Sequence, residues 1–147
     1  MGTLRIPRGV RNKNPLNIRH GQARWQGLAA KQSDKEFCQF SDMRWGWRAA
    51  FKLLCETYYM KRGLHTLDDI IARWAPAEDG NYPKAYALRV ATAVGCSPDA
   101  ELPHPRANQA IWRRIGWAMA RVENGDWKLD YWAMMSGFAL WFNTLKK

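Results

Sequence analysis

Apolar residues recur at helical spacing along most of the chain beyond residue 40. A first helix is predicted from an N-cap at Ser41 to an end at Gly63, because Ser caps helices well and Gly commonly ends them. Its inward face is marked by Trp47, Phe51, Leu54 and Tyr58. A second helix follows Thr66 and stops at Pro76, since proline cannot continue a helix.

The second half of the chain predicts three more helices. One passes through Tyr86 and is closed by Gly95, and a loop with three prolines follows at residues 96–105. The next helix runs from Pro105 to about Val122, and the last covers roughly residues 129–145. Helical spacing also places four indoles in the predicted core: Trp47, Trp112, Trp117 and Trp132.

Residues 1 to about 35 lack helical spacing and are predicted to form loops. Residues 24–27 and 36–40 alternate weakly between apolar and polar side chains, which indicates a short β-hairpin. The chain has no internal repeat and no Pro-, Gly- or Ser-rich linker. The predicted fold class is mainly α (α+β), with one compact helical domain over residues 1–147 and a small β-hairpin or irregular corner near the N-terminus.

Residues 8–19, RGVRNKNPLNIR, form a polar segment that suits neither a helix nor a strand. The segment contains three asparagines, a proline and four basic side chains, and Asn and Pro favour turns. Ordering so many amide groups is unfavourable unless they form hydrogen bonds. N-acetylated sugars and phosphates are candidate partners for these groups, and a loop held together by its own amides is the alternative.

The chain is strongly basic, with 23 Lys and Arg residues against 13 Asp and Glu residues and a formal net charge of +10. No acidic residue occurs before Asp34. Such a surface attracts polyanions, which include nucleic acid, an acidic cell-wall polymer and an anionic lipid surface. The lack of a recognisable DNA-reading motif and the scattered arginines argue against nucleic acid.

The three cysteines, Cys38, Cys55 and Cys96, show neither a CxxC pair nor the spacing of metal ligands. An odd number without a disulfide framework suits a reducing compartment. Residues 1–5 do not open onto the apolar core of a signal peptide. We therefore expect synthesis in the cytoplasm without a signal peptide, so that action outside would require another route of release.

Among the carboxylates, Glu123 has the most distinctive surroundings. It combines an apolar helix with an abrupt glycine turn, and a helical wheel places it beside Trp112 and Met119. A carboxyl group shielded from water by such neighbours is a candidate general acid near neutral pH. A solvent-wetted residue at a helix end is the alternative. Glu78 and Asp79 are candidates for a second carboxylate or for the polar cap of the following helix.

Several indoles near loops or helix ends, Trp25 and Trp74 among them, are candidates for stacking on sugar rings or for core packing. The sequence contains no histidine pair with metal spacing, no Ser or Cys nucleophile motif and no glycine-rich phosphate cradle. We therefore expect neither a metal nor an organic cofactor.

An ordered set of motifs resembles a family of small phage and prophage lysins in the lysozyme-like superfamily, whose members are often described as phage structural proteins. Residues 8–19 resemble the family's opening, RGIRNNNPGNIR. Further matches follow in the family's order: WQG at 25–27, an aromatic strand at 37–40, GWRA at 46–49, IIARWAP at 70–76 and ENG at 123–125. The resemblance covers about residues 8–125. Leu16 replaces a usual glycine, and the loop at 78–83 departs from the family's Glu-Asn-x-Thr pattern.

Wall glucosaminidases and transglycosylases of this superfamily place a catalytic glutamate at a helix end, ahead of an Asn-containing segment. Here the Glu-Asn-Gly motif at 123–125 comes after that segment. We hypothesise that the chain is a circularly permuted lysozyme-like domain, in which Glu123 faces the loop containing Asn14 and Asn17. A structure with these residues far apart would contradict the hypothesis.

The resemblance implies a peptidoglycan-degrading lysin that cuts the β-1,4 glycan strand as a muramidase or a lytic transglycosylase. Glu123 would be the general acid, and Asp79 or Glu78 would be the base if a second carboxylate takes part. The expected sugar contacts are Asn14, Asn17, Trp25, Trp74 and Tyr86.

The basic surface would hold a monomeric protein on the acidic wall, on anionic lipid or on lipopolysaccharide. It would act in the periplasm and cell wall after holin release, or as a component of the virion. Two alternatives remain: a non-catalytic virion or wall-binding structural protein, and an endopeptidase that cuts the stem peptide of peptidoglycan.

Overall fold

The computed structural model describes residues 5–145, which form two compact units. Unit 1 combines the chain up to Phe51 with the chain from Glu123 onward, and unit 2 comprises Lys52–Val122. Both boundaries fall within continuous helical segments. The sequence therefore shows no linker at either point, and for this reason it predicts a single undivided domain. Residues 1–4, on which part of the signal-peptide expectation rests, lie outside the described residues.

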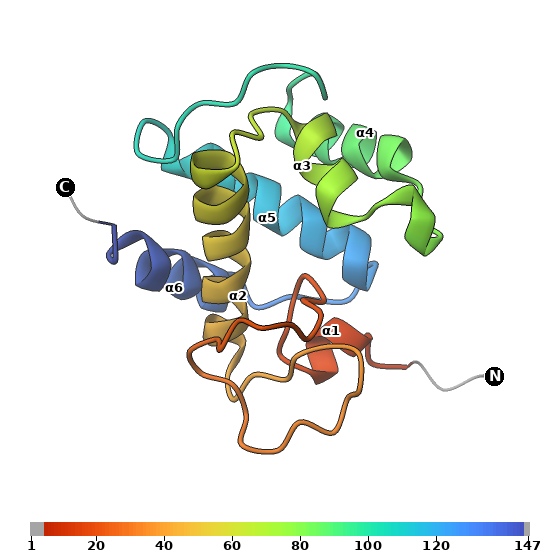
Figure 1. Ribbon diagram of the computed structural model, residues 1–147, viewed down its shortest axis with the longest axis vertical. Helices are drawn as coiled ribbons and strands as arrows, with labels where there is room; N and C mark the ends of the chain where they lie inside the picture. The colour runs from red at the N-terminus through yellow and green to blue at the C-terminus, as the bar shows by residue number, and fades with distance from the viewer. Residues whose placement is uncertain (1–4, 146–147) are drawn as a thin grey trace. The chain divides into compact units, whose positions relative to one another are not determined.

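Unit 1 contains helices α1 (Arg8–Arg11), α2 (Met43–Phe51) and α6 (Tyr131–Phe142), and α2 and α6 lie side by side (Figure 1). Their contact buries aromatic rings that are almost inaccessible to solvent: Trp47, Phe51, Phe138 and Trp141. The Phe51 and Phe138 rings meet edge to face with centroids 5.0 Å apart. Burial of these rings supplies much of the hydrophobic stabilisation of unit 1.

The close approach of α2 and α6 depends on Gly137. A Cβ atom at this position would lie 2.3 Å from Trp47 Cβ and 2.7 Å from the Arg44 carbonyl oxygen. Because one of these neighbours is backbone, the helices would have to move apart.

Gly137→Ala is therefore expected to lower the free energy of unfolding by about 1–3 kcal/mol, although alanine is intrinsically the better helix former. The urea-unfolding midpoint measures this effect. Ser136→Ala, an exposed neighbour on the same helix, is the matched control and should leave the midpoint nearly unchanged. A Gly137→Ala protein as stable as the wild type would contradict the observed packing.

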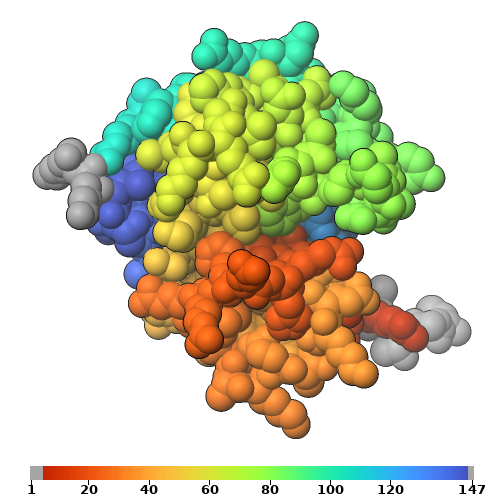
Figure 2. All heavy atoms as spheres, viewed as in Figure 1, coloured from red at the N-terminus to blue at the C-terminus, as the bar shows by residue number. Residues whose placement is uncertain are grey.

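The segment between α1 and α2 is mostly irregular and lies at the surface of unit 1, as Figure 2 shows. In place of the predicted hairpin, two isolated antiparallel bridges join Arg19 to Phe37 and Leu28 to Phe40. Asp34 ties the segment to α1, because Arg8 Nε and Nη2 donate to its two carboxylate oxygens at 2.7 and 2.8 Å. The short alternating pieces thus pair at single points and do not form a ladder.

Asp34 also predicts a pH dependence of stability. The hydrogen bonds from Arg8, assisted by backbone N–H groups and Asn12, hold the pKa of Asp34 far below its ordinary value, although partial burial opposes this. A carboxylate whose pKa is lower in the folded state stabilises the fold above its unfolded pKa of about 3.9, and this contribution disappears as the pH falls.

We therefore expect Asp34→Asn to be less stable than the wild type at neutral pH, with a difference that narrows as the pH falls below about 4. Urea-unfolding midpoints between neutral pH and about pH 3 measure this difference. A difference that stayed constant across the range would show that the ion pair does not stabilise unit 1.

Unit 2 contains the π-helix η1 (Lys52–Lys61), α3 (Leu67–Trp74), the 3-10 helix η2 (Ala77–Asp79), α4 (Pro83–Val94) and most of α5 (Gln109–Asn124). Helices α3 and α4 pack side by side (Figure 1). The cap predicted at Thr66 is confirmed, since its hydroxyl oxygen accepts a hydrogen bond from the Asp69 N–H at 3.1 Å. Helix α4 ends before Gly95, as predicted.

The structure corrects five expectations about the helices. Residues 8–11 form the short helix α1, although the segment 8–19 was expected to suit no helix, because its turn-forming asparagines and proline begin only at residue 12. The cap of α2 is Asp42, whose side chain accepts the Arg44 N–H, while Ser41 Oγ bonds the Gly27 carbonyl. The second half of that helical stretch is π rather than α. The α5 helix begins at Gln109 rather than near Pro105, and α6 spans Tyr131–Phe142, a narrower range than 129–145.

The side chain of Trp132 also departs from the prediction. It is 73% exposed and does not belong to the core. Helix α6 is apolar on nearly every face, so the sequence pattern does not reveal which face is buried. Within residues 5–145, no helix has the length and apolar character that a membrane span requires.

Candidate functional site

Asn17 and Glu123 meet in unit 1, although 106 positions separate them in the chain. The Asn17 Nδ2 group donates a hydrogen bond of 2.8 Å to Glu123 Oε1. Glu123 is half-buried and lies in the last turn of α5. The predicted proximity of the Asn-rich loop to the Glu-Asn-Gly helix end is thus confirmed, while the roles of the two residues remain predictions.

The backbone at Asn17 adopts φ of +54°, in the left-handed region. Asn enters this region more readily than most residues because its short polar side chain bonds locally. The Asn17 N–H also donates to the Asn14 carbonyl at 3.0 Å, which closes the turn. This backbone conformation aims the Asn17 amide at the Glu123 carboxylate.

Asn14 holds the loop in shape and is inaccessible to solvent. Its Nδ2 group donates to the Ile18 and Cys38 carbonyls at 2.9 Å, and its Oδ1 accepts from the Ile18 N–H. A side chain with all these bonds and no exposure cannot touch a sugar. The sugar contact expected at Asn14 is therefore wrong, because its amide forms hydrogen bonds with the protein backbone.

Gly9 and Asn124 complete the support of the site. Asn124 is 5% exposed, and its Nδ2 donates to the Pro15 carbonyl at 2.8 Å. A Cβ atom on Gly9 would lie 2.5 Å from Asn124 Oδ1, 2.8 Å from the Asn14 carbonyl and 3.1 Å from Asn17 Oδ1. Only glycine therefore lets α1, the Asn-rich turn and the end of α5 approach this closely.

The aromatic residues that were expected to contact sugars differ in how far their side chains are exposed to solvent. Trp25 in unit 1 is half-exposed, as is Trp74 in unit 2, which meets the Tyr58 ring edge to face. Tyr86 is only 9% exposed, and its hydroxyl donates to the Met119 carbonyl at 3.4 Å. The sugar contact expected at Tyr86 is therefore wrong, because the ring belongs to the core of unit 2.

Glu78 and Asp79 are exposed residues of η2 in unit 2. They do not cap the following helix, since α4 starts after Tyr82 without a side-chain cap. This corrects the structural role expected for them, and their role as a second carboxylate remains a prediction.

The sequence pattern did not indicate the roles of Gly9 and Asn124. It also did not indicate that a cysteine and a histidine are neighbours. Cys38 Sγ lies 3.8 Å from His20 Nδ1, and His20 Nε2 lies 2.7 Å from the Asp34 carbonyl oxygen. Burial raises the pKa of the Cys38 thiol, and the residue is 3% exposed. A nucleophilic cysteine needs an accessible thiolate, so this pair does not favour peptidase chemistry.

The hydrogen bond from Asn17 Nδ2 fixes the position of the Glu123 carboxyl group. Within residues 5–145, no group of three or more His, Cys, Asp or Glu side chains has a geometry that could hold a metal ion. The arrangement fits general acid chemistry on an uncharged leaving oxygen.

Comparison with known proteins places the chain in a phage family. No family model matches the sequence. Protein P5 of Pseudoalteromonas phage PM2 is 36% identical over 134 residues, which cover 89% of this chain and 79% of the phage protein. The predicted connection with bacteriophages is thereby confirmed. The chain belongs to the same family as protein P5 of Pseudoalteromonas phage PM2.

Proposed function

We propose that this chain is a phage-type lysin that cleaves the glycan strand of peptidoglycan, with Glu123 as the general acid. The observation that supports the proposal most is the half-buried Glu123 carboxyl, held at 2.8 Å by the Asn17 amide. Protonation of a glycosidic oxygen requires a carboxyl group that is held in a fixed position. The family relationship to a phage protein supports the biological setting.

In the proposed reaction, a proton on the Glu123 carboxyl group moves to the glycosidic oxygen as the bond from that oxygen to the sugar's anomeric carbon breaks. The departing sugar leaves as an alcohol, and positive charge develops on the ring that remains. Water then adds in a muramidase, activated by a second carboxylate. In a transglycosylase, the substrate's own hydroxyl and N-acetyl groups replace both water and the second carboxylate.

The proposed fold is a circularly permuted lysozyme-like domain. Unit 1 brings together residues from the two ends of the sequence, and this supports the permutation. Trp25, as a half-exposed indole in the same unit as Glu123, is the proposed stacking surface for a sugar ring. The excess of basic residues would hold the protein on acidic wall polymers, with a strength that falls as salt is added.

Mass spectrometry of the soluble fragments that the purified protein releases from sacculi tests this function. Anhydro-muramic ends would identify a transglycosylase, and reducing ends would identify a hydrolase. New free amino groups would instead support an endopeptidase. If no fragment were released but the protein still sedimented with sacculi, the chain would be a wall-binding protein and the proposed reaction would be rejected.

A further inference from the structure

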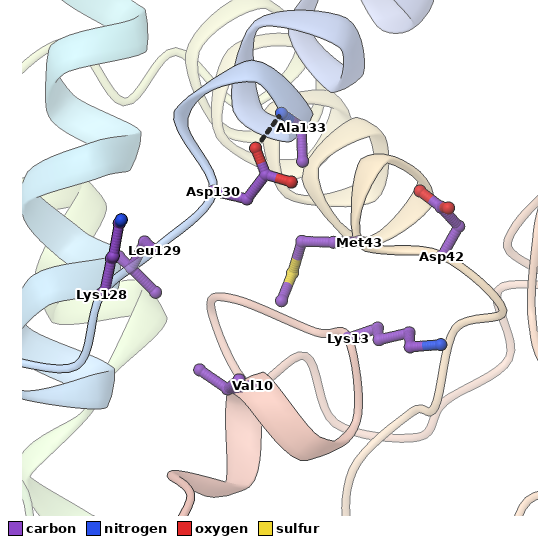
Figure 3. A pocket seen from close by; sticks show the side chains of 8 residues that line it. All are labelled: Val10, Lys13, Asp42, Met43, Lys128, Leu129, Asp130 and Ala133. Atoms are coloured by element: carbon purple, nitrogen blue, oxygen red, sulfur yellow. Dashed lines mark hydrogen bonds between the residues drawn. The ribbon is translucent and has the colours of Figure 1, made fainter.

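Unit 1 contains a second feature besides the Glu123 site: a pocket of about 330 Å³ between α1, the start of α2 and the start of α6. Figure 3 shows the side chains that line it: Val10, Lys13, Asp42, Met43, Lys128, Leu129, Asp130 and Ala133. Nothing in the proposed glycan chemistry uses these residues. We propose that this pocket binds the acidic peptide stem of the wall polymer, an inference that rests on the proposed function.

The lining combines apolar and cationic groups. Val10, Met43 and Leu129 provide apolar surface of a size that suits small side chains such as methyl groups. Lys13 and Lys128 are exposed on the rim. Lys13 Nζ donates one long hydrogen bond of 3.3 Å to the Ser41 carbonyl, so two of its three N–H donors remain available.

The two carboxylates of the lining are already engaged. Asp130 Oδ1 accepts the Ala133 N–H at 3.1 Å, and Asp42 Oδ1 accepts the Arg44 N–H at 3.0 Å. Both are helix caps, so their charge is partly balanced by the N-terminal ends of α6 and α2. A ligand carboxylate would therefore pair with the two lysines. A short peptide that has both carboxylates and small apolar side chains complements the charged and apolar parts of the pocket.

The position of the pocket within unit 1 also favours this ligand. Val10 directly follows Gly9, which packs against Asn124 and Asn17, while Lys128 lies five positions beyond Glu123. The same short helix, α1, thus lines the pocket and supports the acid site. Two extended residues span about 7 Å, so a peptide attached to the sugar can reach a neighbouring pocket while the glycan lies at Glu123.

Binding of the N-acetylated stem tetrapeptide acetyl-L-Ala-γ-D-Glu-L-Lys-D-Ala, which carries a net negative charge, is followed by NMR and tests the inference without requiring catalysis. We expect saturable shifts of the Val10 and Leu129 methyl signals, and about fivefold weaker binding for Lys128→Ala. Ala133→Met, which fills the pocket from a helical position, should abolish binding without changing the melting temperature. Lys31→Ala, an exposed lysine of unit 1 outside the pocket, is the matched control and should bind like the wild type.

A second measurement separates this inference from the proposed function. Wild-type protein should cleave stem-bearing sacculi faster than glycan strands stripped of peptide, and Lys128→Ala should lose that preference. Failure to cleave either substrate would reject the proposed function, while tetrapeptide binding would still support the pocket's ligand. If both substrates were cleaved equally fast and the tetrapeptide did not bind, the inference about the pocket would be overturned, while the proposed function would stand. Binding of anionic vesicles through Lys128, without tetrapeptide binding, would also overturn it.

Discussion

Exchange of Glu123 for glutamine is expected to slow peptidoglycan cleavage by a factor of about 100 or more. The glutamine side chain has nearly the same shape, and its oxygen can still accept the hydrogen bond from Asn17 Nδ2. It carries no proton that can be transferred to a glycosidic oxygen. The substitution therefore removes the proposed chemistry while the local hydrogen bonding persists.

Dye release from labelled sacculi measures this effect, and the melting temperature shows whether the fold is intact. Glu101→Gln is the matched control, because Glu101 is an exposed glutamate of unit 2 and should keep full activity after the same chemical change. If Glu123→Gln cleaved as fast as the wild type, Glu123 would have no part in the reaction.

Gly9→Ala is expected to have the second large effect, acting on both stability and activity. A methyl group at this position would lie within 3.1 Å of three oxygen atoms, and one of them is the Asn14 backbone carbonyl. Asn14 and Asn124 are buried and hydrogen-bonded, so neither can move aside easily. We expect a loss of about 1–3 kcal/mol in the free energy of unfolding, together with a loss of cleavage.

Gly21→Ala provides the matched control for this change. A Cβ atom on Gly21 would meet nothing within 4 Å, and the residue is exposed in the same unit. Its stability should equal or slightly exceed that of the wild type, because alanine restricts the unfolded chain. Urea unfolding of both variants measures these effects. Equal midpoints for Gly9→Ala and the wild type would show that α1, the Asn-rich turn and the end of α5 do not pack as described.

The contact between Asn17 and Glu123 could be predicted from the sequence because two independent signals agreed. The apolar face of the helix placed Glu123 at the edge of a buried stripe, and the motif order suggested that the Asn-rich loop belongs beside it. The role of Asn14 could not be predicted. An asparagine in a turn can bond its own loop or a ligand, and only its burial reveals which applies.

Local caps were predictable only where one residue was the clear candidate. Thr66 precedes an apolar helix with acidic residues in its first turn, and the cap is as expected. Ser41 and Asp42 are adjacent and both cap well, so the sequence did not decide between them. The exposure of Trp132 depends on which face of α6 meets α2, which is a property of the tertiary packing.

The division into two units could not be predicted from the sequence. Domain boundaries are usually recognised by flexible, polar linkers. Here the chain crosses from one unit to the other within helical segments, where the apolar spacing continues without interruption.

The most direct test of the central claim is a crystal structure of the Glu123→Gln variant with a bound tetrasaccharide of alternating N-acetylglucosamine and N-acetylmuramic acid. We expect the side chain at position 123 to remain hydrogen-bonded to Asn17 and to lie about 3 Å from a glycosidic oxygen. Glycan bound elsewhere on the chain, with this side chain out of reach of every glycosidic oxygen, would contradict it.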